Sequence, residues 1–334
     1  MQAPSLSAPT DATRLDVITP GEAMALFAAQ EAGPLESVAR FHSALAGAEL
    51  NVAIGLARLG LRVGYVSRVG ADSFGRHLQA VLDAEGIDRR HLAVDMQHAT
   101  GFMLKSRSDD GSDPAIEYFR GGSAASRLGV HDYPAAYFAA SRHLHLTGIY
   151  VAVSPSTREF VFRAAQDARA AGRSLSFDPN LRPRLWASRD EMVQTLNQLA
   201  SLADWVLPGL EEGRILTGHE RAEDIADFYL ARGARVVVVK LGAEGAYYAS
   251  ADARGRVPGQ RVERVVDTVG AGDGFAVGLI SGLLEGLALP DAVARGNAIG
   301  ARVVQFPGDS DGLPSRAELQ AQADRITAAR SSRP

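Results

Sequence analysis

The sequence has 334 residues, a formal net charge of −4 and no cysteine, and 46% of its residues are hydrophobic. At about 150 residues per domain this length allows one large domain or two smaller ones, and without cysteine the chain has no disulfides, thiolate metal sites or cysteine nucleophiles. The longest apolar stretch without charge, residues 275–284, is too short for a bilayer-spanning helix of about 20 residues, and the negative balance offers no basic field to nucleic acid. We therefore expect a cytoplasmic protein that binds neither nucleic acid nor membrane.

The two ends of the chain differ in composition from the rest. Residues 1–13 are rich in Ala, Pro, Ser and Thr and have neither the basic nor the apolar segment of a signal peptide, so we predict a disordered tail. Residues 328–334 are predicted to be a second flexible tail. Residues 15–320 between them are expected to form a single folded domain.

From residue 15 onward, short apolar runs alternate with longer segments of helical periodicity. The runs predicted as strands are 63–69, 143–147, 174–177, 205–207 and 236–240. The segments predicted as helices are 49–59, 73–85, 155–171, 189–203, 221–232 and 272–285. Alternation of this kind is typical of an α/β fold whose parallel sheet is covered by helices on both faces.

Two regions, about 22–46 and 98–121, do not follow this alternation. Polar and apolar residues alternate there without a helix, and strands at 101–106 and 115–120 would flank a turn at 109–113. We predict that the two regions form a small antiparallel β lid over the mouth of the parallel sheet.

Candidate site residues follow the predicted strands, because ligands of open α/β sheets bind outside the carboxyl ends of the strands. The most informative segment is 267–275, D-T-V-G-A-G-D-G-F, which opens the last predicted helix. The small residues Gly270, Ala271 and Gly272 allow backbone N–H groups to converge at the helix N-terminus, where they and the helix dipole favour an anion. Asp273, in the first turn, would lie beside that anion hole as a base for a hydroxyl group.

The segment 267–275 has one plainer interpretation, and two other known motifs are excluded. A glycine-rich turn with Asp273 as an ordinary first-turn acid would contain the same residues. A P-loop is excluded because no Gly-Lys-Ser/Thr follows. A dinucleotide-binding fingerprint is excluded because the glycines are spaced G-x-G-x-G and lie late in the chain.

The segment 267–275 resembles the D-T-x-G-A-G-D-x-F signature of the ribokinase-like (PfkB) sugar kinases, and other segments match that family in order. These are 46–53 (A-G-A-E-L-N-V-A), 68–75 (R-V-G-A-D-S-F-G) and 240–245 (K-L-G-A-E-G). The resemblance covers about 15–320. It implies a ribokinase-like three-layer αβα domain with a mostly parallel central sheet and a β lid, the use of ATP and Mg²⁺, and a homodimer formed through the lid. A dependence on a monovalent cation is left open.

The resemblance also implies roles for individual residues. Asp273 would be the catalytic base, the amides of Gly270, Ala271 and Gly272 would form the anion hole, and Gly47 and Asn51 would contact the sugar. The nucleotide-binding residues would be Lys240, Gly242, Gly245, Gly270, Gly272 and Asn297. Residues 208–212 (P-G-L-E-E) correspond to a metal-linked N-x-x-E motif in which Gly209 replaces Asn, so Glu212 would act on Mg²⁺ only indirectly. Lys240 could instead cap its strand, and Asn297 could be structural.

Two further segments narrow the acceptor. Residues 118–126 (Y-F-R-G-G-S-A-A-S) resemble the Y-x-R-x-G-S-A-x-S of 2-keto-3-deoxygluconate kinases, and residues 177–186 resemble an F-D-x-N-x-R-x-x-L-W motif that fructokinases share. The resemblance implies that Tyr118, Arg120 and Arg182 contact the substrate, with Met103 where a second lid tyrosine is often found. A guanidinium group suits a sugar-acid carboxylate, which it can bind through two hydrogen bonds.

The expected activity is therefore ATP-dependent phosphorylation of a sugar-acid hydroxyl, from 2-keto-3-deoxygluconate to its 6-phosphate. The alternatives are a fructokinase or another sugar kinase, and a sugar-binding regulator without catalysis. Each arginine could instead form a surface ion pair, and Tyr118 could belong to the lid core. His143 and His145, on one strand face, are expected to be packed rather than to bind a metal.

Overall fold

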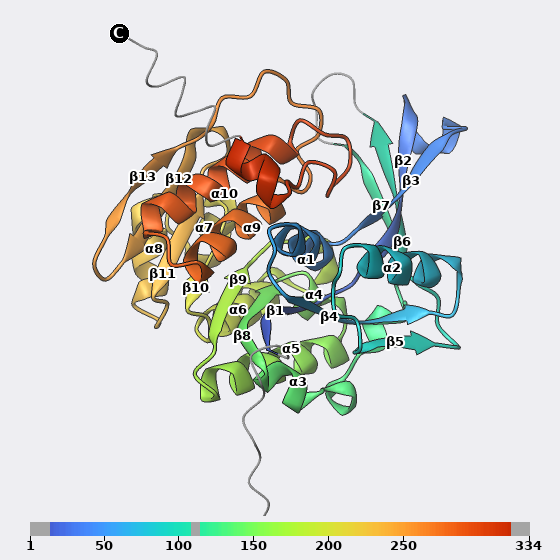
Figure 1. Ribbon diagram of the computed structural model, residues 1–334, viewed down its shortest axis with the longest axis horizontal. Helices are drawn as coiled ribbons and strands as arrows, with labels where there is room; N and C mark the ends of the chain where they lie inside the picture. The colour runs from blue at the N-terminus through green and yellow to red at the C-terminus, as the bar shows by residue number, and fades with distance from the viewer. Residues whose placement is uncertain (1–13, 108–113, 322–334) are drawn as a thin grey trace, which may run out of the picture.

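Strands and helices alternate along the chain as predicted (Figure 1). The computed structural model describes residues 14–107 and 114–321. The predicted tails 1–13 and 328–334 and the predicted turn at 109–113 lie outside the described residues.

A nine-stranded sheet forms the centre of the domain, in the order β13-β12-β11-β10-β9-β8-β1-β4-β5. Its strands from β11 to β5 are parallel, whereas β12 and β13 form an antiparallel edge. The bounds are β1 Leu15–Pro20, β4 Val63–Gly70, β5 Leu92–Asp95, β8 Ser141–Thr147, β9 Ser174–Asp178, β10 Trp205–Val206, β11 Val236–Lys240, β12 Gly245–Ser250 and β13 Arg254–Pro258. The mostly parallel central sheet is thus confirmed.

Helices cover both faces of this sheet and give the three-layer arrangement that the sequence predicts (Figure 1). One face packs against α1 (Ala48–Arg58), α2 (Ser73–Ala84), α9 (Ala271–Leu284) and α10 (Leu289–Val303). The other packs against α3 (Ala135–Ala139), α4 (Tyr150–Val153), α5 (Pro155–Ala170), α6 (Arg189–Ala200), α7 (Leu210–Thr217) and α8 (Ala222–Leu230). Strand β11 is apolar at successive positions because both of its faces are buried. Val237 and Val239 belong to the core on one face of the sheet, and Val238 belongs to the core on the other.

The predicted helices agree with the observed ones to within about three residues at each end. Helices α7 and α10 and the hairpin β12–β13 are not among the predicted elements. Helices α9 and α10 pack closely at glycines, since a Cβ added at Gly278 of α9 would lie 2.6 Å from the Cα of Gly296.

The lid is a separate four-stranded sheet in the order β3-β2-β6-β7 (Figure 1). Its strands are β2 Met24–Ala32, β3 Phe41–Ala46, β6 Phe102–Arg107 and β7 Ile116–Phe119. The pairs β2–β3 and β6–β7 are antiparallel as predicted, whereas the central pair β2–β6 is parallel. The hairpins β2–β3 and β6–β7 lie side by side and are joined by the parallel pair β2–β6. Between β3 and β6 the chain runs through the central domain.

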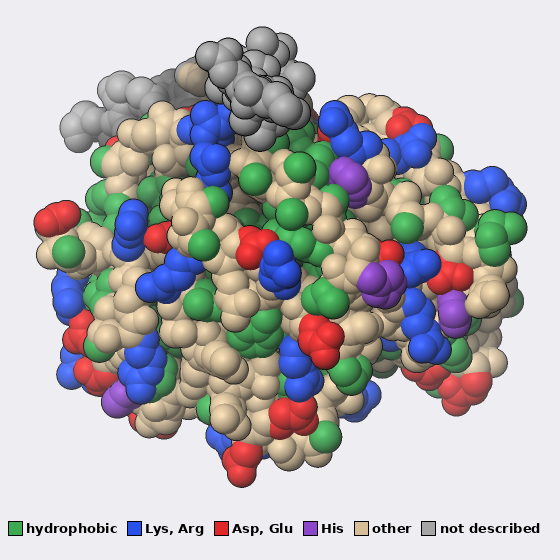
Figure 2. Space-filling view, turned by 90° about the horizontal axis from the view of Figure 1, so that it is seen from below, with side chains coloured by type: hydrophobic (Ala, Val, Ile, Leu, Met, Phe, Trp, Pro, Cys, Tyr) green, Lys and Arg blue, Asp and Glu red, His purple; other side chains and the backbone are tan. Residues whose placement is uncertain are grey.

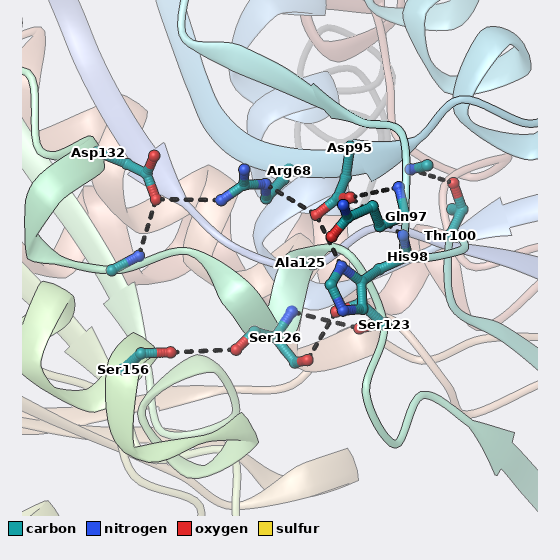
Figure 3. Close-up of polar contacts among 12 residues, drawn as sticks. Arg68, Asp95, Gln97, His98, Thr100, Ser123, Ala125, Ser126, Asp132 and Ser156 are labelled. Atoms are coloured by element: carbon teal, nitrogen blue, oxygen red, sulfur yellow. Dashed lines mark hydrogen bonds and ion pairs between the residues drawn. The ribbon is translucent and has the colours of Figure 1, made fainter.

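Polar contacts hold the base of the lid, beside the segments that lead into β6 and out of β7 (Figure 3). Arg68 of β4 contacts Asp95 at 3.2 Å and Asp132 at 3.4 Å. The backbone N–H of Thr100, two residues before β6, donates to Asp72 at 2.7 Å. Asp72 is also the N-cap of α2, where its side chain accepts from the N–H of Gly75. The segment that leads into β6 is therefore attached to the central domain through Asp72.

Acidic and basic side chains lie interspersed on the face shown in Figure 2, in keeping with the small net charge of −4. Within residues 14–107 and 114–321, every helix is too short or too polar to span a bilayer.

Candidate active site

A cavity of about 760 Å³ lies between the carboxyl ends of the central strands and the lid. Its walls include every site residue that the sequence predicts, from segments spread over most of the chain. These residues are Gly47, Asn51, Met103, Tyr118, Arg120, Arg182, Glu212, Lys240, Gly242, Gly245, Gly270, Ala271, Gly272, Asp273 and Asn297. The structure thus brings them together in one place, while their individual roles remain predictions.

The anion-hole turn is built at the N-terminus of α9. Gly270 is the N-cap and has φ +83°, a left-handed conformation that favours glycine. A Cβ added there would lie 2.5 Å from the backbone oxygen of Asp309, so only glycine fits without a shift. The amides of Gly272 and Asp273 lie in the first turn, where a helix supplies no acceptor for its own N–H groups. The turn can therefore donate to an anion in the cavity.

Asp273 is buried in the first turn of α9, next to that turn. Its Oδ2 accepts a 2.8 Å hydrogen bond from Asn51 Nδ2. Burial raises the pKa of Asp273 to about 7, with the negative charges of Asp178 and Asp309 adding to the rise and Asn51 and Lys240 opposing it. A carboxyl group with such a pKa exchanges a proton near neutral pH, which is what a general base requires.

Lys240, at the end of β11, pairs with Asp178 at 2.6 Å. Its Nζ lies 3.5 Å from where a Cβ on Gly272 would stand, so the ammonium is beside the anion-hole turn. Burial disfavours its charged form, but the carboxylates of Asp178 and Glu212 outweigh burial and raise the pKa of Lys240. Lys240 therefore provides a permanent positive charge beside the N-terminus of α9.

Glu212, the predicted indirect metal residue, is engaged with the backbone. Its Oε1 accepts from the N–H of Leu181 at 2.8 Å, and its Oε2 accepts from the N–H of Gly209 at 2.7 Å. Among the residues that the structure describes, no group of three or more His, Asp or Glu side chains is arranged to hold a metal ion. Glu212 thus connects the segments of Leu181 and Gly209 through their backbone N–H groups.

The two histidines of β8 are packed, as the sequence predicts. His143 contacts the hydroxyls of Ser174 and Ser176 at 2.8 Å each, and His145 shares the Ser176 hydroxyl at 2.8 Å. Burial lowers the pKa of both imidazoles, so both are neutral. These contacts belong to the core and not to the cavity.

The predicted nucleotide end is formed by the turn between β11 and β12. Gly242 and Gly245 have φ +61° and +102°, and a Cβ on Gly245 would lie 2.1 Å from the carbonyl oxygen of Val257. Asn297 of α10 donates from Nδ2 to the carbonyl oxygens of Val257 at 3.1 Å and Pro258 at 3.2 Å. Its amide nitrogen therefore has a structural role, and only its carbonyl oxygen is left for a ligand.

The acceptor end contains a buried ion pair that the sequence did not predict. Arg120 donates from Nε to Glu22 Oε2 at 2.7 Å, and Ser123 donates from Oγ to Glu22 Oε1 at 2.5 Å. Tyr118 lies beside the guanidinium, with its ring centre 5.9 Å from the Arg120 Cζ, and Met103 belongs to the lid core. The protein thus neutralises Arg120 with its own carboxylate, which lies close to the start of β2.

Arg182 is in a different situation. It is half-buried and donates from Nη1 to the backbone oxygen of Leu181 at 2.9 Å. No carboxylate in the described part of the chain forms an ion pair with it. The preceding Asn180 has φ +39°, the left-handed conformation, and this bend turns the chain along the cavity wall. Arg182 is therefore the cavity-lining guanidinium best placed to bind an acidic ligand.

Three polar residues inside the quoted motifs are not among the predicted site residues: Asn180 and Glu49 line the cavity, and Asp178 contacts its Lys240. Asn180 Nδ2 lies 3.5 Å from Asp273 Oδ1. Burial raises the pKa of Glu49 to about 7, and the hydroxyl of Thr147 donates to this carboxyl group. Burial also raises the pKa of Asp178, against the pull of Lys240. Each motif names several polar residues, and only the folded structure shows which of them face the cavity.

Residues 14–316 match the family described as "pfkB family carbohydrate kinase". The chain is 52% identical over 307 residues to 2-dehydro-3-deoxygluconokinase of Bacillus subtilis (strain 168), covering 92% of this chain and 94% of that protein. A crystal structure of a PfkB protein from Polaromonas sp. JS666 is 55% identical, with a TM-score of 0.86 over 92% of this chain and 99% of that one. A candidate ribokinase II from E. coli, solved with ATP and Mg²⁺, is 28% identical with a TM-score of 0.87 over 93% and 99% of the two chains.

Proposed function

Because the chain belongs to the pfkB family of carbohydrate kinases, and so is a sugar kinase, we propose that it transfers the γ-phosphoryl group of ATP to 2-keto-3-deoxygluconate. The product would be the 6-phosphate, formed at the terminal hydroxyl of the sugar acid. The observation that carries the proposal is the 52% identity to a 2-dehydro-3-deoxygluconokinase, an enzyme for the same sugar acid under its other name. The cavity supports the proposal because two suitable side chains line its wall. These are the buried Asp273 and Arg182, which has no carboxylate partner in the described part of the chain.

In the proposed reaction Asp273 accepts the proton of the attacking hydroxyl. Its carboxyl group is buried, hydrogen-bonded by Asn51, and has a pKa of about 7. At neutral pH a large share of the molecules therefore carry the ionised form, and the proton taken up is held only moderately tightly. Asn51 keeps one carboxylate oxygen oriented, and Oδ1 is the oxygen left to face the acceptor.

The amides of Gly270–Asp273 and the ammonium of Lys240 would stabilise the negative charge on the transferring group. The donor brings a divalent cation with it, and Mg²⁺ neutralises phosphate charge when bound. Both carboxylate oxygens of Glu212 accept hydrogen bonds from backbone N–H groups. The residues present therefore fit a magnesium ion that would be held mainly by phosphate oxygens and water. The proposed use of ATP is also the argument for a cytoplasmic protein.

Arg182 would bind the carboxylate of the acceptor, with Gly47, Asn51, Met103, Tyr118 and Arg120 forming the rest of that end of the cavity. The ion pair of Arg120 with Glu22 limits what Arg120 can offer to a second anion. Gly47 lines the same cavity, and only glycine fits there, because it has φ +150° and an added Cβ would lie 2.5 Å from the carbonyl oxygen of Glu22.

The test is a coupled ADP-release assay over 2-keto-3-deoxygluconate, gluconate, fructose and ribose. We expect kcat/KM for 2-keto-3-deoxygluconate to exceed each neutral sugar by at least about 10²-fold, since losing a buried charge pair costs a few kcal/mol. Equal or better use of fructose would reject the sugar acid as the substrate while leaving the sugar kinase intact.

Fructokinase activity is the second candidate, and one observation favours it. Glu22 already neutralises Arg120, so the acceptor end holds one guanidinium without a carboxylate partner rather than two. A neutral ketose would need no second positive charge. The same substrate panel separates the two candidates.

We also propose a homodimer formed through the lid. Phe119 is 46% exposed on the lid face opposite Tyr118, and it stacks on Phe102 with ring centres 4.5 Å apart. An exposed aromatic side chain on a small sheet is a liability that association removes. Light scattering after gel filtration should give twice the mass of one chain, and Phe119→Lys should shift the protein toward the monomer.

A further inference from the structure

A buried ion cluster connects the lid to the anion-hole turn. Lys105 lies on β6, two residues after Met103 and on the same face of the strand, and its side chain is 4% exposed. Its ammonium contacts Asp309 Oδ1 at 2.9 Å and also donates to Asp267 Oδ2. Both carboxylates are buried, with side-chain exposures of 9% for Asp267 and 4% for Asp309. One lid residue thus joins two segments of the central domain.

Both aspartates shape the anion-hole turn directly. Asp267 Oδ1 accepts a 3.0 Å hydrogen bond from the N–H of Val269, which folds the chain just before Gly270. The backbone oxygen of Asp309 lies against Gly270, so close that an added Cβ would be 2.5 Å away. A displacement of either aspartate therefore moves the turn that presents the amides of α9.

The charges explain why the lid matters for this geometry. Two carboxylates buried close together repel each other, and burial raises the pKa of Asp309 while the ammonium of Lys105 opposes that rise. Asp311 adds a further negative charge on the same loop. The positive charge that balances them comes from β6, so the two loops are held in place by a group that belongs to the lid.

We propose that Lys105 is a positioning residue for phosphoryl transfer: its ammonium holds the Asp267 and Asp309 segments in the geometry of the anion hole, and couples that geometry to the position of the lid. The proposal rests on the kinase function proposed above and deepens it. Met103, on the same strand face, lines the acceptor end of the cavity. Strand β6 therefore connects the acceptor end to the donor end.

The experiment compares Lys105→Met, which removes the charge, with Lys105→Arg, which keeps it. Glu117→Gln, on the exposed side of the neighbouring strand β7, is the control for a charge change in the lid. We expect Lys105→Met to lower kcat/KM for ATP by about 10²-fold, Lys105→Arg by less than about tenfold, and the control to stay within about twofold. Ammonium or potassium ions at about 100 mM should restore about tenfold in Lys105→Met and leave the wild type unchanged, because a free cation can occupy the space between two carboxylates.

Two results would overturn the proposal. One is a Lys105→Met enzyme that keeps kcat/KM for ATP within about threefold of the wild type. The other is a loss that Lys105→Arg shares and that neither cation reverses, since a residue that only packs the lid would give that pattern. Should Lys105→Met fail to fold, the double variant Lys105→Met/Asp309→Asn takes its place, because it removes one charge of each sign. The proposal is then overturned if the double variant keeps kcat/KM for ATP within about threefold of the wild type, or if Lys105→Arg shares its loss and neither cation reverses it.

A wild-type enzyme with no turnover on any sugar would contradict the proposed function and not the role of Lys105. Calorimetry with a non-hydrolysable ATP analogue then decides on Lys105 by itself. Binding to Lys105→Met about tenfold weaker than to the wild type supports the positioning role, and equal binding overturns it.

Discussion

Asn51 donates a 2.8 Å hydrogen bond from Nδ2 to Oδ2 of Asp273, joining two residues that are 222 positions apart in the chain. Asn51 lies in the first turn of α1 and Asp273 in the first turn of α9. The two helices pack on the same face of the sheet, so their N-termini meet at the cavity. The contact links the predicted sugar-binding segment to the predicted base.

Asp273→Asn is expected to abolish most of the turnover while leaving nucleotide binding intact. Asparagine keeps the shape and can still accept from Asn51, but it cannot take up the proton of the acceptor hydroxyl. We expect kcat to fall by about 10²- to 10⁴-fold, the usual contribution of a general base. Steady-state kinetics and calorimetry with an ATP analogue measure the two effects, and near-normal kcat would remove Asp273 from this role.

The activity of the wild type should rise with pH through about 7, the raised pKa of Asp273. The base is active when ionised, so kcat/KM should increase up to that pH and level off above it. A profile of kcat/KM at saturating nucleotide checks this. A midpoint near the ordinary aspartate pKa of about 4 would mean that burial does not control the group.

Asn51→Leu should move that midpoint to higher pH. The hydrogen bond from Asn51 stabilises the ionised carboxylate and lowers the pKa of Asp273 against the effect of burial. Its removal should shift the midpoint upward by about one pH unit. Asn180→Leu is a matched control, because Asn180 Nδ2 is 3.5 Å from the other carboxylate oxygen and should shift the midpoint less. A midpoint unchanged in Asn51→Leu would contradict the assignment of the titrating group.

Arg182→Ala should separate sugar acids from neutral sugars. We expect kcat/KM for 2-keto-3-deoxygluconate to fall by about 10²-fold and that for fructose to change much less, because only the acid has a carboxylate for the guanidinium. Arg184→Ala, an exposed arginine on the same turn, serves as the control. An equal loss on both substrates would argue against carboxylate recognition by Arg182.

The contrast with Arg120 shows where prediction from the sequence ends. Both arginines were predicted from residue type and position, and both do line the cavity. Glu22 lies just before β2 and Arg120 just after β7, and they meet only because β2 pairs with β6 and β6 with β7 in the lid. The pairing of strands that are distant in the sequence determines which carboxylate contacts an arginine. No local sequence pattern predicts that pairing.

The anion-hole turn, by contrast, was predictable because its parts are contiguous. Gly270, Gly272 and Asp273 lie within one segment, and the start of a helix fixes where their amides point. The layers of the fold were predictable for a similar reason, since each strand and helix has its own local periodicity. Lys105 and Asp309 were not, because a charged residue in a lid strand and another in a late loop carry no local sign of their contact.

Arg120→Ala is therefore expected to act on stability before it acts on substrate choice. It leaves the Glu22 carboxylate buried without its guanidinium, a change that costs about 3–5 kcal/mol. The melting temperature should fall by about 6 °C, in contrast to Arg182→Ala, which should stay within about 2 °C of the wild type. Thermal unfolding monitored by circular dichroism measures both. An unchanged melting temperature for Arg120→Ala would show that the ion pair with Glu22 contributes little to folding.

Asp273→Asn should also make the protein more stable, and more so as the pH rises. Because the folded pKa of about 7 is above the ordinary value of 3.8, the folded state holds a proton that the unfolded chain releases at lower pH. The stability linked to Asp273 is thus fully present below about pH 4, and it is lost as pH rises toward about 7, where burying the ionised group costs about 4 kcal/mol. Asparagine is neutral in both states and escapes this cost. The difference in melting temperature between variant and wild type should therefore grow from about pH 4 to about pH 7, reach about 6 °C, and then level off. A difference that does not change with pH would show that burial does not destabilise the ionised Asp273 carboxylate.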